Sequence, residues 1–594
     1  MKRLIRLLSE LRRRSVFRVG VVYGAVAFVA LQVADLVVEP LRLPPWTMGL
    51  LILLAAVGFP LALVLAWAFE ITPDGVRRTD PEPDSSARPV ATGLGARDVA
   101  LLGLALVVVG SAWLGLRSPG EGGGEPDPQG SPLSGDVTIA VLPFADMSPE
   151  GDHEYFADGM TEELIHLLTA VEGVRSIPRT SAFAFKGQGG DVRDMGRALG
   201  AEFVLEGSVR RFQDRLRITA QLVDVVAGVT LRSDSWERQV EDIFLMQDEI
   251  ARSIVDALRG HLPAGVLGEA RESEEADFEA YDLYLRGRFF WHRRTEEGLR
   301  QARGLFQEAV SRAPQYARGW VGLADAYAVL GFYEYLPPGD AFPRARAAAE
   351  RALELDAELA EAHATLGYVA LYYEWDHGRA EGEFLRALEL DSTYATGHQW
   401  YGNLLTAQGR FGEAERAMRR AAEWDPLSLI ARGALAWSLH YGGENERALV
   451  ELARVLAVDP EFQVAHLWRG QALKALGRLG EAELALDRAV ELSGGGDLAL
   501  AARARLRALQ GRETEALEIL GTLEHGGPDE YVPSYELARG YATLGDEERA
   551  LAWLERARNE RVRSMVFLEV EPAFVPLRGH PRFQELVREV VGGT

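Results

Sequence analysis

Two ladders of small residues, each with a period of 34 residues, run through the C-terminal half of this chain. The first ladder consists of Gly402, Ala436, Gly470, Ala504 and Ala538, and the second of Ala414, Ala448, Ala482, Ala516 and Ala550. Two ladders that share one period predict repeated pairs of helices whose backbones touch at the small residues. Each repeat buries its core against the next one, so the array is extended and offers a surface typical of proteins that bind other proteins.

The spacing within each repeat resembles that of the tetratricopeptide repeat. With Gly402 at position 8 of a 34-residue unit, small residues fall at positions 8, 20 and 27. Pro426 and Pro460 fall at position 32, where a proline ends the second helix. We therefore expect an all-α superhelix of about eight units over residues 280–564, closed by a C-terminal cap over residues 565–594.

The resemblance implies a concave groove that is lined by fixed positions of the first helix in each unit. The candidate peptide-binding residues at these positions are Tyr368, Tyr372, Gln399, Asn403, Thr406, Trp437, His440, Tyr441, Gln471 and Lys474. Aromatic and amide side chains suit an extended or helical peptide. Of the Lys and Asn set with which chaperone-binding relatives clamp a terminal carboxylate, only Asn403 and Lys474 remain. The alternative is that the candidates merely pack within the superhelix.

Three apolar runs follow a basic N-terminal segment, residues 1–18, which we expect to be cytoplasmic. The runs cover residues 19–38, 46–69 and 99–116. A helix needs about 20 apolar residues to span the hydrocarbon core of a bilayer, so we expect three transmembrane helices. Residues 117–136 are rich in Gly, Pro, Glu and Ser and are expected to form a flexible linker.

The distribution of arginine predicts the orientation of these helices. Basic residues are concentrated before the first run, and four more arginines lie between the second and third runs, so both segments are expected in the cytoplasm. Three crossings then place everything after residue 116 on the extracytoplasmic side. The alternative is that the third run does not insert, which would leave the C-terminal domains in the cytoplasm.

Residues 137–262 alternate between strand and helix patterns. Hydrophobic periodicity predicts a strand, a helix, a second strand, a second helix, three antiparallel strands and a closing helix. The turns between the last three strands are expected at Gln213 and Asp214 and at Ala227 and Gly228. This order of elements is typical of an α/β layer domain.

Four stretches of this domain resemble the TolB amino-terminal-like domain, which precedes tetratricopeptide repeats in many bacterial membrane proteins. They are IAVLPF (139–144), FADGMTEEL (156–164), LEGSVR (205–210) and QDEIA (247–251). The resemblance implies a bacterial membrane protein. Together with the orientation predicted from the arginines, it predicts a multi-pass protein of the bacterial inner membrane with a cytoplasmic N-terminus and with its C-terminal domains in the periplasm. Relatives with the same tail often carry a nucleotide cyclase or a winged-helix DNA-binding domain ahead of the membrane, and we expect neither in this chain.

No group of residues has the spacing of an active site. Asp158, Glu162 and Glu163 could form a carboxylate pair, but they fit a helix N-terminus better, with Asp158 as its cap. The loop that begins at Lys186 lacks the spacing of a phosphate-binding loop. We therefore assign no catalytic, cofactor-binding or metal-binding residue, expect no cofactor, and interpret the chain as not being an enzyme.

The net charge of −24 argues against nucleic acid as a partner, because phosphate binding needs clustered Lys and Arg. The expected partners are a protein or peptide in the groove and the lipid bilayer, with a homo-oligomer as a further option. Together these features predict a membrane-anchored scaffold or adaptor in envelope assembly or signalling. The alternative is a signal-transduction receptor, in which the α/β domain senses a small ligand or the state of the envelope and relays it through the membrane helices.

Overall fold

The computed structural model describes residues 69–72, 75–78, 136–262, 277–525 and 532–592. The first and third predicted membrane segments lie outside these ranges. So do the second segment and the linker, except for the last residue of each, Phe69 and Asp136. Two short strands, β1 (Phe69–Thr72) and β2 (Gly75–Arg78), pair antiparallel, so Phe69 begins a strand instead of ending a helix. Among the described residues, no helix is both long enough and apolar enough to cross a membrane.

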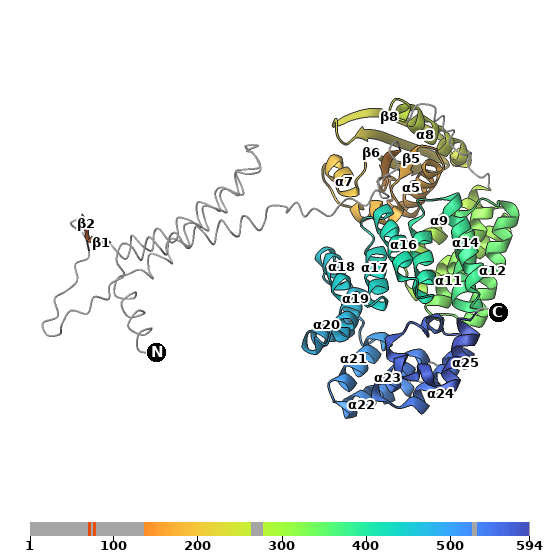
Figure 1. Ribbon diagram of the computed structural model, residues 1–594. Helices are drawn as coiled ribbons and strands as arrows, with labels where there is room; N and C mark the ends of the chain where they lie inside the picture. The colour runs from red at the N-terminus through yellow and green to blue at the C-terminus, as the bar shows by residue number, and fades with distance from the viewer. Residues whose placement is uncertain (1–68, 73–74, 79–135, 263–276, 526–531, 593–594) are drawn as a thin grey trace. The chain divides into compact units, whose positions relative to one another are not determined.

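The chain divides into two compact units, residues 1–127 and 128–594, and the second unit contains both the α/β domain and the helical array (Figure 1). The α/β domain is built on a mixed sheet with the strand order β5-β3-β6-β7-β8, and β4 pairs with β6 beside this path. The strands are β3 (Val137–Val141), β4 (Ala145–Asp146), β5 (Val174–Ser176), β6 (Phe203–Phe212), β7 (Arg215–Asp224) and β8 (Val229–Gln239). β3 runs parallel to β5 and β6, whereas β6, β7 and β8 form an antiparallel meander.

The two predicted turns connect the strands of this meander. Gln213 and Asp214 lie between β6 and β7, and Ala227 and Gly228 lie just before β8. Gly228 has a φ of 68°, a left-handed conformation that glycine adopts without steric cost. Both turn predictions are therefore confirmed.

Helices cover both faces of the sheet, and the principal ones are α5 (Glu154–Thr169), α8 (Ile243–Leu258) and α7 (Val192–Leu199). The residues of β3 show how the faces are divided. Ile139 and Val141 belong to the core under α5 and α8, whereas Ala140 and Leu142 pack with Leu199 of α7. Successive side chains of a strand point to opposite faces, so a strand covered on both faces is apolar throughout.

The array consists of eight antiparallel helix pairs within the described residues, numbered units 1 to 8 in chain order. Units 1 to 4 are α9 (Phe278–His292) with α10 (Glu296–Arg312), α11 (Ala317–Phe332) with α12 (Pro338–Leu355), α13 (Ala360–Val369) with α14 (His377–Leu390), and α15 (Ala395–Ala407) with α16 (Phe411–Trp424). Units 5 to 8 are α17 (Leu429–Tyr441) with α18 (Asn445–Val458), α19 (Gln463–Ala475) with α20 (Leu479–Leu492), α21 (Asp497–Leu509) with α22 (Glu513–Glu524), and α23 (Ser534–Leu544) with α24 (Glu547–Asn559). In unit 3, α13 continues into a π-helical turn, η3 (Ala370–Glu374).

The small residues of the first ladder are contact points between the two helices of a unit. A Cβ atom added at Gly402 would lie 2.9 Å from the side chain of Met418, and one added at Gly470 would lie 2.5 Å from that of Leu486. Both distances are shorter than a van der Waals contact, so the backbone of the first helix approaches the second more closely than any larger residue allows.

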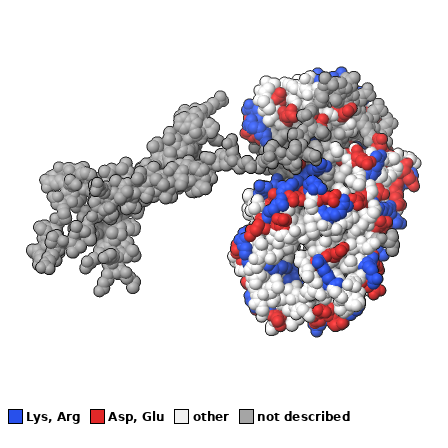
Figure 2. Space-filling model, viewed as in Figure 1, with Lys and Arg blue, Asp and Glu red and all other residues white. Residues whose placement is uncertain are grey.

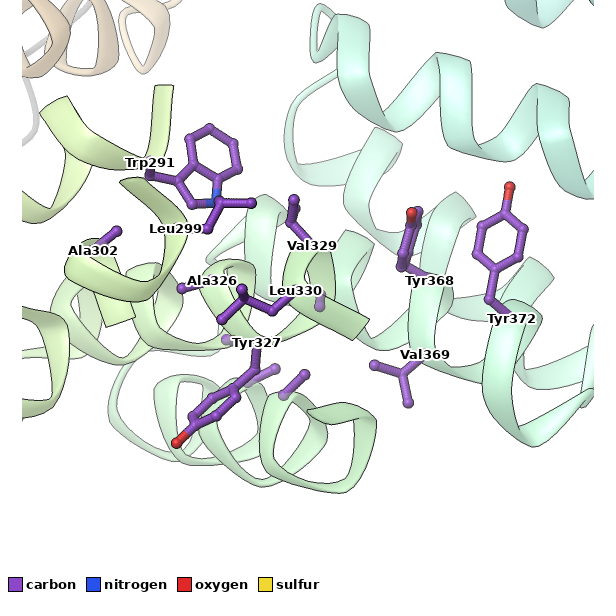
Figure 3. Packing of buried hydrophobic residues seen from close by; sticks show 14 of the residues in the cluster. Trp291, Leu299, Ala302, Ala326, Tyr327, Val329, Leu330, Tyr368, Val369 and Tyr372 are labelled. Carbon is purple, nitrogen blue, oxygen red and sulfur yellow. The ribbon is translucent and has the colours of Figure 1, made fainter. Parts of the chain in front are cut away.

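One continuous hydrophobic cluster runs from the sheet into the first units of the array. It joins Phe156 of α5 and Ile250 of α8 to Trp291 of unit 1, Leu330 of unit 2 and Tyr368 of unit 3. Figure 3 shows the part of this cluster that lies within units 1 to 3. Because the two domains share this core, separating them would expose apolar surface on both.

After unit 8 the chain forms two 3-10 helices, η4 (Arg563–Phe567) and η5 (Pro572–Gly579), and a last α-helix, α25 (Pro581–Val590). The array curves so far that its C-terminal end returns to unit 3 (Figure 1). There Arg561 donates a 2.6 Å hydrogen bond to the backbone carbonyl of Tyr373. Residues 561–579 are called the cap segment below.

Candidate functional site

A buried carboxylate of α5 holds the α/β domain to the array. Glu162 is only 5% exposed, and its Oε1 accepts hydrogen bonds from Arg288 Nε at 2.9 Å and from Arg288 Nη2 at 2.5 Å. Its Oε2 lies 3.1 Å from His292 Nε2 and 3.2 Å from Arg179 Nε. Arg288 and His292 belong to α9 of unit 1, whereas Arg179 belongs to the α/β domain. One ionic cluster is therefore shared by two domains.

The environment fixes the protonation of this cluster. Burial favours the neutral acid, but Arg288 outweighs it, with help from His292 and Arg179, and holds the pKa of Glu162 well below its usual value. Burial and the charge of Arg179 lower the pKa of His292 to about 3, so its imidazole is neutral at pH 7. A neutral imidazole that faces a carboxylate donates its Nε2–H, which makes His292 a fixed hydrogen-bond donor in the junction.

Further contacts extend along the edge of the array. Glu163 accepts a 2.5 Å hydrogen bond from Arg318 Nη1, in the first turn of α11. His166 Nδ1 lies 3.4 Å from the carboxylate of Glu361, in the first turn of α13. The α/β domain thus contacts the N-terminal ends of the first helices in units 2 and 3, in addition to α9 of unit 1.

The α/β domain also reaches the turn between units 4 and 5. Ser181 Oγ donates to Asp425 Oδ1 and accepts a 2.8 Å hydrogen bond from the backbone N–H of Leu427. The guanidinium group of Arg175 stacks 4.0 Å over the ring of Trp424. Burial raises the pKa of Asp425 to about 6, although the hydrogen bond from Ser181 opposes that rise. The α/β domain therefore bridges the array from unit 1 to the turn before unit 5.

The helix-cap interpretation of Asp158 is wrong. Helix α5 begins at Glu154, so Asp158 lies inside the helix, where it is buried and accepts a 2.6 Å hydrogen bond from Lys186. Glu162 and Glu163 do not stabilise the helix N-terminus either, because they lie two turns in and pair with arginines of the array. The acidic face of α5 is a docking surface for the array.

The predicted groove residues of unit 3 belong to a closed aromatic cluster. The rings of Tyr368 and Tyr372 lie side by side, 4.6 Å apart (Figure 3), and neither side chain is more than 5% exposed. Phe332 of unit 2 packs against both rings at 5.4 Å, and Asn403 of unit 4 is hydrogen-bonded to Tyr372. Arg563 of the cap segment lies 3.9 Å over the ring of Phe332 and closes the cluster.

The predicted groove residues of unit 5 contact the cap segment directly. The ring of Phe567 lies 4.9 Å from that of Trp437 and 5.8 Å from that of Tyr441. The hydroxyl of Tyr441 donates a 2.8 Å hydrogen bond to Glu571 Oε2. Trp437 and Tyr441 therefore lie against the cap segment, so a segment of the same chain covers these two candidate groove residues.

Two further candidates make contacts inside the array. Thr406 is fully buried, and its hydroxyl lies 2.8 Å from that of Ser438 in the next unit. His440 Nδ1 lies 2.6 Å from Asn445 Oδ1, and burial lowers the pKa of His440 to about 4, so this imidazole is neutral at pH 7. Both side chains pack between helices.

The remaining candidates lie in units 4 and 6. Gln399 is half-buried on α15. Gln471 is buried and accepts a 2.7 Å hydrogen bond from Lys474 Nζ. Burial and the neighbouring charges of Arg505 and Arg539 hold the pKa of Lys474 well below its usual value. Lys474 thus belongs to a group of cations on the concave face.

Two members of that group, Arg505 and Arg539, were missed by sequence reasoning. They follow Trp437 and Gln471 at intervals of 34, so the register that found the earlier candidates also reaches these two arginines. Arg505 is only 1% exposed, and both side chains face the concave interior of units 7 and 8. Continuing the repeat position of Trp437 and Gln471 into units 7 and 8 would have found both arginines.

These arginines hold Glu571 of the cap segment. Arg539 Nη2 lies 3.1 Å from Glu571 Oε2, and Arg539 Nη1 donates to Glu536 at 3.0 Å. Glu571 is 2% exposed, and its Oε1 also accepts from the backbone N–H of Ala573. Burial favours the neutral acid, but Arg539 and Arg505 outweigh it and lower the pKa of Glu571 to about 2. A charged carboxylate is therefore locked into the concave face.

The cap segment crosses most of the concave face in this way. Arg561 lies 4.4 Å over the ring of Trp375 in unit 3, Phe567 contacts unit 5, and Glu571 reaches Arg539 in unit 8. The groove expected to be open to a partner is therefore occupied by the chain itself.

A polar hollow lies where unit 1 meets the α/β domain. It has a volume of about 690 Å³, and it is lined by Arg211, Asp214, Val240, Glu241, Asp277, Phe278, Glu279, Asp282, Leu283, Arg286, Glu308 and Arg312. The hydroxyl of Tyr155 donates a 2.7 Å hydrogen bond to Asp282 beside it. Three arginines and six carboxylates line this hollow, which suits a small polar ligand that carries both donors and acceptors.

On the face shown in Figure 2, basic and acidic side chains are interspersed over the second unit. In the part of the chain that the structure describes, no group of three or more His, Asp or Glu side chains is placed to hold a metal ion.

Comparison with known proteins identifies the array. Residues 395–426 and 464–494, which correspond to units 4 and 6, match the tetratricopeptide repeat family. The array is a tetratricopeptide repeat region. Among solved structures, yeast Tom70 is similar with 18% identity and a TM-score of 0.35, over 53% of this chain and 68% of that one. Pseudomonas aeruginosa PilF is similar with 24% identity and a TM-score of 0.28, over 36% of this chain and 95% of that one.

A curated relative from Rhizobium meliloti (strain 1021), named "Putative adenylate cyclase 3", is 36% identical over 311 residues. The match covers 51% of this chain and 45% of the relative, so the chain spans less than half the length of that protein. The expectation that this chain is not an enzyme is wrong on this comparison, because the relative carries the name of an enzyme. The name also points to signalling.

Proposed function

We propose that this chain is a signal-transduction receptor of the bacterial inner membrane, related in function to the relative named as an adenylate cyclase. In this proposal, the tetratricopeptide array and the α/β domain receive the signal as one body outside the cytoplasm. The three apolar N-terminal segments carry it across the membrane, and a change in cyclic AMP is its output.

The observation that carries the proposal is the buried ionic junction between the two domains. Glu162 is buried, Arg288 and His292 are mostly shielded from solvent, and a hydrogen-bonded cluster of this kind tolerates few alternative geometries. A displacement of α9 therefore has to move α5 with it. Coupling between two sites requires a physical connection of this kind.

The hollow beside unit 1 supports the sensing role of the α/β domain. Arg211 comes from β6 of the sheet, whereas Asp282 and Arg286 come from α9 of the array. A small polar ligand that bridged these side chains would change the contact between the α/β domain and unit 1. An open scaffold is less well supported, because the cap segment covers the concave face that a scaffold would offer.

Signalling through the junction can be tested in cells that make the full chain. Cyclic AMP would be measured for the wild type, for Glu162→Gln and for the matched control Glu237→Gln, whose exposed carboxylate pairs with Arg217 on the sheet surface. We expect Glu162→Gln to change the cyclic AMP level and Glu237→Gln to leave it as in the wild type. The same level in all three strains and in cells without the protein would overturn the proposal.

The membrane arrangement needs its own measurement. Reporter enzymes that are active only in the periplasm or only in the cytoplasm would be fused after residue 135. Activity of the periplasmic reporter is expected. Activity of the cytoplasmic reporter alone would mean that the third apolar segment does not insert.

A further inference from the structure

The outer edge of β8 is a long stretch of strand that no described strand pairs with. β8 has 11 residues, whereas β5, at the opposite edge of the sheet, has three. Natural sheets usually keep exposed edge strands short, because their free backbone N–H and C=O groups accept strands of other chains. β8 lies on the outer side of the α/β domain, away from the array (Figure 1). This edge is therefore available for pairing with a strand of another chain.

The ladder between β7 and β8 shows which backbone groups of β8 point outward. The N–H of Val240 donates a 3.0 Å hydrogen bond to the carbonyl of Asp214, so the backbone of Val240 points toward β7. This direction alternates along an antiparallel strand, and the pairing with β7 is regular from residue 239 back to residue 232. The N–H and C=O groups of every second residue therefore point away from the sheet. These residues are Ser233, Ser235, Glu237 and Gln239, and all four are exposed.

The side chains of the residues between them lie on the face of the sheet that α8 covers. Asp234 accepts a 2.7 Å hydrogen bond from Ser253, and Arg238 donates one of 2.5 Å to Glu249, and both of these partners belong to α8. Trp236 lies between the two and packs against the margin of the core. One face of β8 thus carries a carboxylate, an aromatic ring and a guanidinium group at intervals of two residues.

We propose that β8 pairs antiparallel with β8 of a second copy of this chain, with Trp236 on the twofold axis. In this arrangement, Asp234 of each copy lies opposite Arg238 of the other. Opposite charges and aromatic rings are favourable pairs across neighbouring strands. The four outward-pointing residues of each strand also pair with one another, which adds about eight backbone hydrogen bonds. The two sheets then form one sheet that continues across the axis.

Charge favours this register over two of its neighbours. With Asp234 on the axis, the Asp234 carboxylates of the two copies would lie opposite each other. With Ser235 on the axis, Arg232 of each copy would lie opposite Arg238 of the other. Like charges directly opposite each other destabilise a strand pair, so both registers are disfavoured.

The backbone disfavours a third register, in which Ser233 lies on the axis. Arg232 would then lie opposite Asp234, which satisfies the charges. This register would bring Leu231 into the new ladder, and Leu231 is the extra residue of a bulge in the pairing with β7. A bulge bends the strand and interrupts its hydrogen bonds. Of these four registers, the one with Trp236 on the axis satisfies both the charges and the backbone.

Disulfide cross-linking of the full chain tests the register, because the sequence contains no cysteine. Chains with Ser233→Cys and chains with Gln239→Cys, which carry different affinity tags, would be produced together and oxidised. In the proposed register, residue 233 lies directly opposite residue 239 of the second copy. The Cα atoms of such a pair are about 5.5 Å apart, which a disulfide can bridge. We therefore expect a disulfide-linked dimer that carries both tags.

Each of the other registers has a cross-link of its own, which serves as a matched control. Ser233→Cys alone reports the register with Ser233 on the axis, and Ser235→Cys alone reports the register with Ser235 on the axis. Ser233→Cys mixed with Ser235→Cys reports the register with Asp234 on the axis. In the proposed register, the Cα atoms of these pairs are more than about 7 Å apart, too far for a disulfide. A dominant cross-link in any of the three controls would overturn the proposed register.

A proline on the outer edge tests whether backbone pairing holds the two copies together. Ser235→Pro removes an N–H that points away from β7, so the sheet keeps its own ladder. In the chains with Ser233→Cys and Gln239→Cys, we expect Ser235→Pro to lower the yield of cross-linked dimer about tenfold or more. Ser235→Thr, the matched control, keeps the N–H and should leave the yield within about twofold. Circular dichroism and thermal melting would show that both variants remain folded.

The dimer and the proposed function can fail separately, because pairing through β8 goes beyond that function and does not depend on the output of the receptor. A folded Ser235→Pro variant that cross-links as well as its control would overturn the dimer. The lack of any cross-link between Ser233→Cys and Gln239→Cys would also overturn it. Neither result would alter the cyclic AMP comparison of Glu162→Gln with the wild type, which tests the proposed relay.

Discussion

Tyr441 donates a 2.8 Å hydrogen bond to Glu571, a residue that lies 130 positions further along the chain. The pair joins the middle of the array to the segment that follows its last unit. The carboxylate is buried and charged, so it is satisfied only while the cap segment stays in the concave face. The closed state of the groove therefore depends on a few polar contacts as well as on the packing of the buried apolar residues of the cap segment, such as Phe567, Phe574 and Leu577.

The hydroxyl of Tyr441 can be removed without changing the shape of the ring. We expect Tyr441→Phe to lower the free energy of unfolding by roughly 1.5–3 kcal/mol, because the buried Glu571 loses a charged hydrogen bond. Urea denaturation followed by tryptophan fluorescence would measure the loss. Tyr401→Phe is the control, since the hydroxyl of Tyr401 donates to the less buried Glu381 at 3.1 Å. Equal losses in both variants would contradict a special role for Tyr441.

Acid should release the cap segment. The pKa of Glu571 is about 2 in the folded protein and lies near 4.5 in an unfolded chain. A carboxylate whose folded pKa is depressed contributes stability that is fully present above the unfolded value, and this contribution is lost as the pH falls from 4.5 towards 2. In that window, protease cleavage within residues 561–579 should increase for the wild type. Glu571→Gln should be cleaved readily at neutral pH, and a wild-type cleavage rate that does not change with pH would contradict the prediction.

The junction between the domains should be sensitive to the loss of one partner. Glu162→Gln leaves Arg288 with only one of its two carboxylate partners, Asp325 at 3.3 Å, and we expect a destabilisation of up to about 3 kcal/mol. Adding Arg288→Met should recover part of that loss, since the remaining cation is then removed as well. Chemical denaturation of the single and double variants would measure this coupling. A double variant whose loss in free energy of unfolding equals or exceeds the sum of the two single losses would argue against a direct pair.

Acid should weaken the same junction through His292. Its pKa is about 3 in the folded protein and near 6.5 when unfolded, so the unfolded chain binds the proton more readily. Stability therefore falls as the pH decreases from 6.5 towards 3. His292→Gln, which keeps a donor to Glu162, should reduce the slope of stability against pH in that range. An unchanged slope would show that His292 is not the group that titrates.

Two glycines of unit 6 should respond in opposite directions to the same substitution. A Cβ at Gly470 would lie 2.5 Å from Leu486, so Gly470→Ala is expected to destabilise the protein by roughly 1–3 kcal/mol. A Cβ at Gly480 meets no atom within 4 Å among those described, so Gly480→Ala should stabilise α20 by up to about 1 kcal/mol. Thermal melting of both variants distinguishes the sign. Destabilisation by both substitutions would contradict the close helix contact at Gly470.

The repeat register predicted much of the array, because helix contacts depend only on residues one unit apart. Gly402 and Gly470 occupy the contacts that their spacing predicts. The same register placed Trp437 and Tyr441 on the concave face, and it also reaches Arg505 and Arg539 when it is continued. The sequence did not reveal that Glu571 occupies that face, because the return of the cap depends on the curvature of all eight units and not on any local pattern.

The role of α5 was hidden for a similar reason. Glu162 and Glu163 look like ordinary solvated acids when only their own helix is considered. Their partners, Arg288 and Arg318, lie more than a hundred residues away, and a pairing between domains leaves no periodic signal in a sequence. Asp158 was misplaced because α5 begins one turn earlier than its acidic residues suggest.

The bridge that the α/β domain makes along the array has a mechanical consequence. A solenoid whose units touch only their neighbours stretches and bends easily, because small changes at each interface add up along its length. Here Glu163 and Ser181 tie α11 and the turn before α17 to one rigid sheet domain. The first half of the array therefore resists lengthening, and the cap segment, which contacts units 3, 5 and 8, opposes the opening of the rest.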